Sequence, residues 1–222
     1  MLSWCSDGTC YTPTKGLDND AMDTFVLLML IGAGAYALKN MEQRQRIAWL
    51  ATYLQGYQVE KLMEGLTSGY LRALGEDDPE RSGPIWRMLE STEATLGGQL
   101  DKLAKDIGNM DEAKARVSTL ALALPWAARL FPGAAFDLRK AVAIHAQGFA
   151  RVASNTEGLS RKKQAFTLSA ELFLFQHTCH WYCRSRAVAS ARMHARHQTT
   201  HAQLLEAVSP ATRRAYDALI GR

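Results

Sequence analysis

Histidine and cysteine side chains gather in one stretch near the C-terminal end of the chain, over residues 171–201. Five of the six histidines lie there, together with two of the four cysteines. Imidazole and thiolate groups are the usual protein ligands of zinc and copper, and both also bind haem iron. The stretch therefore suggests a transition-metal or haem site. Its candidate ligands are His177, His180, Cys183, His194, His197 and His201.

The spacing of these ligands limits such a site. On a helix, His177 and His180 are neighbours three residues apart, and His180 and Cys183 are neighbours in the same way. One straight helix therefore offers two adjacent ligands, whereas a structural zinc site needs four. His180 and His194 are fourteen residues apart, about 21 Å along a helix, so the two groups share a metal only if the helix folds back.

Each group of ligands also has an interpretation without a metal. Residues 177–183 can form a core face next to Phe175, because free cysteines such as Cys179 are favoured in buried positions. His194, His197 and His201 would lie on one narrow helical face, which is also typical of a solvated basic surface. The chain contains no HExxH or CxxC motif that would favour the metal.

Glu171 is the one carboxylate in a strongly apolar segment, LSAELFLF. A buried glutamate must pair or stay protonated. We expect Glu171 either to contact Arg184 or His145, or to lie on the exposed side of its helix. No GxSxG elbow and no phosphate-binding glycine loop occurs in the chain. The sequence thus lacks a complete catalytic set, which favours a non-enzymatic role.

The elements that position these residues are predicted to be helices throughout. Proline is infrequent, apolar residues recur three or four positions apart, and no alternating Val/Ile/Thr-rich run indicates a strand. We therefore expect an all-α bundle of five or six helices with a long C-terminal helix. The expected helices cover residues 41–74, 82–107, 111–124, 136–153, 160–208 and 209–221, and the fifth is either one helix or two that meet near 185–190 or 199–200.

Residues 126–136 interrupt the helical pattern with Arg129, Pro132 and Gly133. We expect them to form a buried connection, and we expect the apolar side chains of 117–136 to pack in the core. The alternative is an element that lies at a membrane surface.

The longest apolar run in the chain, TFVLLMLIGAGAYAL, occupies residues 24–38. As a helix it would be roughly 22 Å long, somewhat short of the ~30 Å hydrocarbon core of a bilayer. Its flanks favour a membrane span, because acidic residues precede it and Lys39, Arg44 and Arg46 follow it. This asymmetry would place most of the chain in the cytoplasm. The expected anchor residues are Phe25, Leu28, Leu30, Ile31, Gly32, Gly34, Leu38 and Lys39.

Two alternatives to a membrane anchor stay open. A buried core helix fits the length of the run and would make the protein soluble. A cleavable signal peptide would need a basic N-terminal region, whereas the region before this run is acidic.

The chain divides into a flexible tail over 1–21, an anchor helix over 22–40 and a helical bundle over 41–222. The tail contains Cys5 and Cys10, which could form a disulfide bond if the N-terminus lies outside the cell. The net charge of +4 is mild and the charges are interspersed, so we expect no nucleic-acid partner.

These patterns together favour a single-pass membrane protein without enzymatic activity or cofactor. Its helical domain would bind a protein partner or a second copy of itself. The first alternative is a metal- or haem-binding bundle that uses residues 171–201. The second is a soluble helical protein in which residues 24–38 form a core helix.

Overall fold

The computed structural model describes residues 15–221, and within that range it consists of ten α-helices, one short 3-10 helix and one two-stranded sheet. The all-α prediction is confirmed, and the helices exceed the expected five or six because several are short. Residues 1–14, which include Cys5 and Cys10 of the expected tail, lie outside the described part. The elements are α1 (Lys15–Leu54), α2 (Val59–Leu74), α3 (Pro79–Gly108), α4 (Glu112–Ala115), β1 (Arg116–Ser118), α5 (Ala127–Leu130), η1 (Pro132–Ala134), β2 (Ala135–Asp137), α6 (Leu138–Ala153), α7 (Arg161–Cys183), α8 (Arg186–His197), α9 (His201–Ala207) and α10 (Pro210–Ile220).

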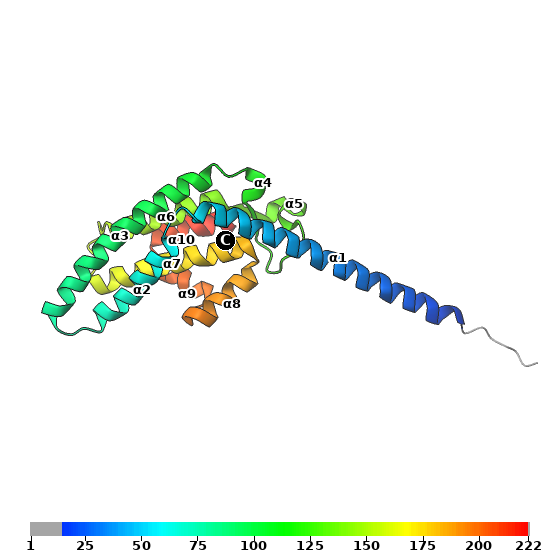
Figure 1. Ribbon diagram of the computed structural model, residues 1–222, viewed down its shortest axis with the longest axis horizontal. Helices are drawn as coiled ribbons and strands as arrows, with labels where there is room; N and C mark the ends of the chain where they lie inside the picture. Colours follow the sequence, from blue (N-terminus) through cyan, green and yellow to red (C-terminus); the bar gives the residue numbers. More distant parts are fainter. Residues whose placement is uncertain (1–14, 222) are drawn as a thin grey trace, which may run out of the picture.

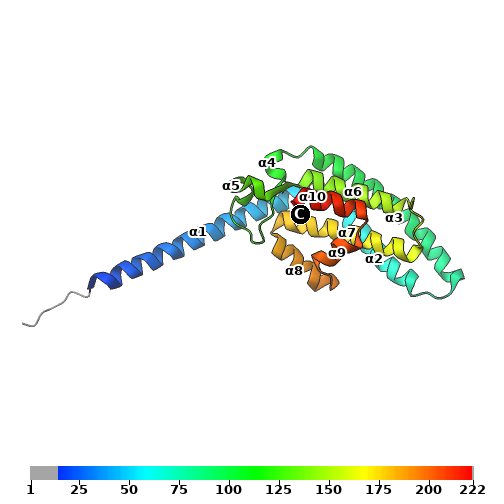
Figure 2. The ribbon, with the colours of Figure 1, turned by 180° about the vertical axis from the view of Figure 1, so that it is seen from behind.

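Helix α1 has two different environments along its length (Figure 1). Its C-terminal part packs on α7 and α3, where Gln43 and Leu50 are buried. Its N-terminal part projects away from the body in both views (Figures 1 and 2). Every side chain of residues 21–38 is exposed. Because α1 begins at Lys15, residues 15–21 are helical, whereas they were expected to belong to the flexible tail.

The helix expected over 41–74 is in fact two helices. α1 ends at Leu54, a turn follows at 55–58, and α2 begins at Val59. Gly56 lies in this turn and weakens the helix there, since glycine costs about 1 kcal/mol relative to alanine in a helix. The turn allows α2 to fold back and pack against α3. The predicted stop at Gly75 is confirmed, because Gly75 caps α2.

Helix α3 begins earlier than the expected Ser82–Pro84 start. Asp78 is its N-cap and accepts a hydrogen bond from the backbone N–H of Glu80, and Pro79 occupies the first turn. Proline is tolerated there because the N–H groups of the first turn have no partner within the helix. Apolar residues recur three or four positions apart along this helix, and the buried ones are Leu89, Leu96, Leu100, Leu103 and Ile107.

The prediction that the chain contains no strand was wrong for two short segments. β1 and β2 pair antiparallel, with Val117 opposite Phe136. The indole Nε1 of Trp181 donates to the Ser118 carbonyl at 2.9 Å, which ties β1 to α7. Strands of three residues are too short to show an alternating pattern, so packing against α7 decides their conformation.

The region after β1 is also less buried than expected. Ala127 and Ala128 are buried, as a core connection requires, but Trp126, Leu130 and Phe131 are exposed. Residues 119–124, expected to continue a helix, form an irregular loop instead. The apolar side chains of this region therefore do not all pack in the core.

Helix α6 lies at the centre of the body, between α3 and α7, and α10 packs against it. Its apolar face is buried, and it includes Leu138, Val142, Phe149 and Val152. This helix positions His145, which points from α6 toward α7 and α10.

The stretch 160–208 forms three helices instead of the expected one or two, because the chain breaks at both of the two alternative places. The Ser185 side chain accepts a hydrogen bond from the Val188 N–H and begins α8. Gln198 ends α8 in the left-handed conformation, at φ 51°, and Thr200 begins α9 with a capping box that includes Gln203. Each cap satisfies backbone N–H groups that would otherwise lack partners, which lets the chain turn.

Candidate functional site

The exposed half of α1 is the most unusual surface of the described chain. Its most apolar 18-residue window has a mean hydropathy of 1.7, and none of that window is buried. Leu28, for example, is 62% exposed. The predicted anchor residues Phe25, Leu28, Leu30, Ile31, Gly32, Gly34 and Leu38 are all exposed, and Lys39 is half-buried. Helix α1 is long and apolar enough to cross a membrane, and its exposed N-terminal part does not pack in the core of the described chain.

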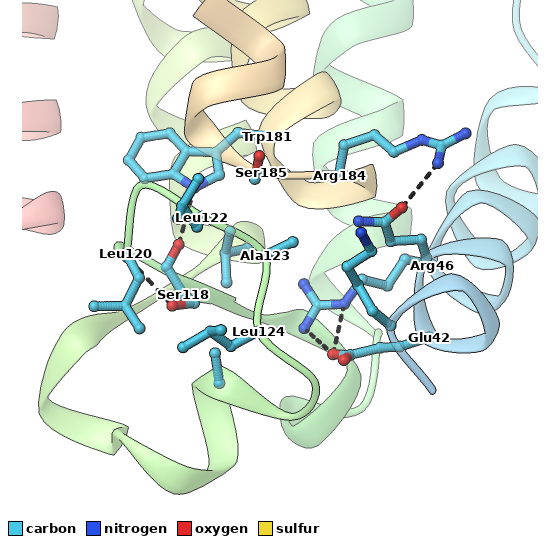
Figure 3. Close-up of a pocket in the computed structure, with 14 residues that line it drawn as sticks. Glu42, Arg46, Ser118, Leu120, Leu122, Ala123, Leu124, Trp181, Arg184 and Ser185 are labelled. Atoms are coloured by element: carbon cyan, nitrogen blue, oxygen red, sulfur yellow. Dashed lines mark hydrogen bonds and ion pairs between the residues drawn. The ribbon is translucent and has the colours of Figure 1, made fainter. Parts of the chain in front are cut away.

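A polar junction fixes α1 on the body just beyond the apolar run (Figure 3). Arg46 forms an ion pair with Glu42 at 2.8 Å and donates to the Tyr182 carbonyl at the end of α7. Arg184 donates to the side-chain oxygen of Gln43 at 2.8 Å. In the sequence, the only sign of this junction is the charged residues that follow the apolar run.

The helix breaks bring one pair of the predicted metal ligands together. His177 on α7 is 0% exposed, and the ring of His201 on α9 stacks on it with centroids 4.4 Å apart. The expected shared face for His194, His197 and His201 was wrong, because the chain turns at Gln198. His194 is exposed on α8, whereas the His197 ring stacks on Phe173.

We define the buried histidine cluster as His145, His177, His201 and Tyr216, contributed by α6, α7, α9 and α10. His145 and Tyr216 have ring centroids 5.3 Å apart, and those of His201 and Tyr216 are 6.2 Å apart. The Thr178 hydroxyl joins two members, at 2.9 Å from His145 Nε2 and 3.1 Å from the Tyr216 hydroxyl. Tyr216 and Thr178 were not among the predicted site residues, since nothing in the local sequence pattern indicates which helices meet.

Burial determines the charge state of this cluster. Burial lowers the pKa of His145 to about 3. Burial lowers the pKa of His177 to about 3 as well, and the neighbouring His201 adds to the effect. Both imidazoles are therefore neutral at pH 7, which is the form that packs without a counter-charge.

The geometry of the cluster does not converge on one ion. A metal binds in the plane of an imidazole ring, at a nitrogen lone pair, whereas the His177 and His201 rings lie face to face at 25°. His177 Nε2 also lies 3.1 Å from the Ser190 hydroxyl. Within residues 15–221, no three His, Cys, Asp or Glu side chains are grouped to hold a metal. The metal or haem site stays a prediction from composition.

The two cysteines of α7, Cys179 and Cys183, are half-buried free thiols. Burial raises the pKa of Cys183 to about 11, and burial also raises the pKa of Cys179. Both side chains are therefore protonated at neutral pH, although the thiolate is the reactive and metal-binding form. His180 is half-buried near them, and burial with the nearby Arg192 lowers its pKa.

Glu171 is buried and does not contact Arg184 or His145, which corrects both expected pairings. One of its carboxylate oxygens accepts a hydrogen bond at 3.0 Å from the backbone N–H of Ser209, the N-cap of α10. Burial raises the pKa of Glu171, while hydrogen bonds from Ser209 and Thr212 oppose the rise. Glu171 therefore ties α7 to the beginning of α10.

Gly148 on α6 makes room for this contact, and its substitution gives a sharp test of the packing. A Cβ atom at this position would overlap Thr212 Oγ1 and lie 2.7 Å from Glu171 Oε2. We expect Gly148→Ala to lower the free energy of unfolding by about 1–3 kcal/mol, as overpacking in a core usually does. Chemical denaturation of both proteins measures the difference.

The matched control is Gly98→Ala on α3, where an added Cβ meets nothing within 4 Å. Alanine should stabilise this helical position by roughly 0.5–1 kcal/mol. Equal effects of the two substitutions would contradict the packing described for Gly148.

Comparison of the chain with models of protein families, with curated proteins and with solved structures finds no match in any of the three.

Proposed function

We propose that this protein is anchored in a membrane by one spanning helix, the N-terminal part of α1, and that its helical body lies at the membrane surface. The exposed apolar half of α1 is the observation that carries the proposal. Burying a leucine, isoleucine or phenylalanine side chain is worth about 1.5–3 kcal/mol, so a whole helix of exposed apolar side chains is strongly unfavourable in water. A bilayer removes that cost, because the backbone of a helix is already hydrogen-bonded.

The length of the exposed segment supports the same proposal. The exposed residues 21–38 form about 27 Å of helix, close to the ~30 Å thickness of the hydrocarbon core; the uncharged run 24–38 takes up roughly 22 Å of it, and Asp23 lies at its N-terminal end. α1 continues unbroken on both sides of this segment, so no backbone group is left unpaired inside the bilayer.

The orientation follows from the charges on either side of the span. Lys15 is the basic residue before the apolar segment within the described chain, whereas Lys39, Arg44 and Arg46 follow it closely. Basic residues favour the cytoplasmic side, so the body is proposed to be cytoplasmic. The body would then bind a protein partner or a second copy of the chain. Within the span, Gly32 and Gly34 leave open space along α1 in which a second helix would fit closely.

Fractionation of cells that express the full chain tests the anchor and its orientation together. The protein should stay with the membranes after an alkaline carbonate wash, because that treatment removes peripheral proteins. Protease added outside intact cells should leave the body undigested. Release by the wash would overturn the span and favour a soluble assembly in which a partner protein covers α1. Digestion of the body from outside would reverse the orientation only.

A further inference from the structure

A second apolar surface lies beside the place where α1 leaves the body (Figures 1 and 2). We call it the apolar loop and define it as residues 119–134, which include α5 and η1. Arg129 is the one charged residue in this loop. Leu122 is 70% exposed and Trp126 is 46% exposed. The exposed large apolar side chains of the loop are Leu122, Leu124, Trp126, Leu130 and Phe131.

The body holds the apolar loop in a defined place. The Thr119 N–H donates to the Ala134 carbonyl at 2.8 Å and closes the loop at its base. The Ala187 N–H donates to the Ala121 carbonyl at 3.2 Å, which joins the loop to α8. Because these contacts use the backbone, the apolar side chains remain free to point outward.

A hydrogen bond joins the apolar loop directly to α1. The backbone N–H of Trp126 donates to the Glu42 carboxylate at 2.9 Å, and the other oxygen of that carboxylate pairs with Arg46. Trp126 adopts the left-handed conformation at φ 53°, which is unfavourable for a large side chain and persists only where surrounding contacts impose it. Leu122 and Leu124 line a small pocket on the same side, next to Lys39 and Glu42 (Figure 3).

This attachment sets the height of the loop along α1. Glu42 follows Leu38, the last residue of the apolar run, by four positions, or about 6 Å of helix. The loop is therefore held at the level where the proposed span ends. That level corresponds to the boundary between acyl chains and headgroups.

The side chains of the loop suit that boundary. Tryptophan is enriched at membrane interfaces, where an apolar ring with one polar group is best accommodated. The apolar loop contains no acidic residue, and Arg129 and Lys39 can both meet anionic headgroups. Glu42, the nearby carboxylate, is neutralised by Arg46.

We propose that the apolar loop inserts into the same leaflet from which α1 emerges, so that the body has a second contact with the lipid surface. This inference rests on the proposed membrane span of α1. Two contacts, one through α1 and one through the loop, prevent the body from swinging freely about α1. They fix which of its faces points toward the cytoplasm.

Tryptophan quenching in vesicles tests this inference with the full chain. Wild type and Trp126→Phe are reconstituted into phosphatidylcholine–phosphatidylserine vesicles, with or without brominated acyl chains near the headgroup. The difference between the two proteins reports the emission of Trp126. Brominated lipid should reduce that difference roughly twofold or more, since interfacial elements lie only ~5–10 Å deep.

Trp86→Phe is the matched control, because Trp86 lies on α3 against Tyr70, away from the loop. The emission assigned to Trp86 should not change in brominated lipid. If the protein floats with the vesicles but Trp126 is not quenched, the loop inference is overturned and the anchor stands. If Trp126 becomes shielded from acrylamide only as the protein concentration rises, a second copy covers the loop and the inference is equally overturned. If the protein does not float with the vesicles, the proposed membrane span of α1 is overturned as well.

Discussion

Leu28→Arg should release most of the protein from the membrane fraction. Leu28 lies near the middle of the exposed apolar segment and is 62% exposed in the isolated chain. An arginine at the centre of a spanning helix costs about 2.5–3.5 kcal/mol on an insertion scale, or on the order of 100-fold in partition.

That cost is comparable with the whole driving force for insertion. The run 24–38 contains seven Leu, Ile, Val and Phe residues. Each contributes about −0.3 to −0.6 kcal/mol on the same scale, so together they contribute roughly −2 to −4 kcal/mol. One arginine therefore removes most of the preference for the membrane. Quantitative immunoblots of carbonate-washed membranes measure the effect.

Leu71→Arg provides the matched control for this experiment. Leu71 is 76% exposed, but it lies on α2 in the body and outside the apolar segment. This substitution should leave the membrane-bound fraction unchanged. Equal release by both variants would show that a new positive charge, rather than its place in α1, displaces the protein. That result would contradict the anchor.

Acid should destabilise the body strongly, beginning below about pH 6.5. The pKa values of His145 and His177 are about 3 in the folded chain, against an ordinary value of 6.5. Below pH 6.5 the unfolded chain binds protons that the folded chain does not. The stability contributed by these neutral histidines is complete above that pH and is lost as the pH falls toward 3. Each histidine lowers the free energy of unfolding by about 1.4 kcal/mol per pH unit in that window.

Together, His145 and His177 therefore lower the free energy of unfolding by about 5 kcal/mol between pH 6.5 and 4.5. This is a large share of the 5–15 kcal/mol that stabilises a typical domain. Glu171 acts in the opposite direction, because its pKa is raised in the folded chain. Its contribution is present below the ordinary pKa of a carboxyl group and is lost as the pH rises through the raised value. It therefore offsets part of the histidine effect.

His145→Phe isolates the contribution of one histidine. Phenylalanine keeps an aromatic ring against Phe175 and Tyr216 but cannot bind a proton. Guanidinium unfolding of the full chain in detergent, followed at pH 7 and pH 5, should show a pH slope that is lower than that of wild type by about 1.4 kcal/mol per pH unit, the share of one histidine. His194→Gln is the control, since His194 is exposed on α8, and its slope should equal that of wild type. An unchanged slope in His145→Phe would mean that His145 is not held neutral.

The sequence alone determined most of the helices and several of their ends. The α3 stripe is visible because residues three or four apart share a helical face, and this relation is local. The Ser160, Ser209 and Gly221 caps are local for the same reason, since each satisfies backbone groups within a few residues. The apolar run of α1 was equally plain, because hydropathy depends on the residues themselves.

Tertiary structure decided everything that depends on a partner distant in the sequence. His177 and His201 meet only because Gln198 turns the chain, and Tyr216 joins them only because α10 packs against α6. The exposure of the apolar loop and its hydrogen bond to Glu42 were likewise hidden, since residues 42 and 126 have no relation in the local pattern. A periodic pattern shows which face of a helix is apolar, but not what covers that face. For the N-terminal part of α1, the described chain leaves the face uncovered, and this carries the proposal of a membrane anchor.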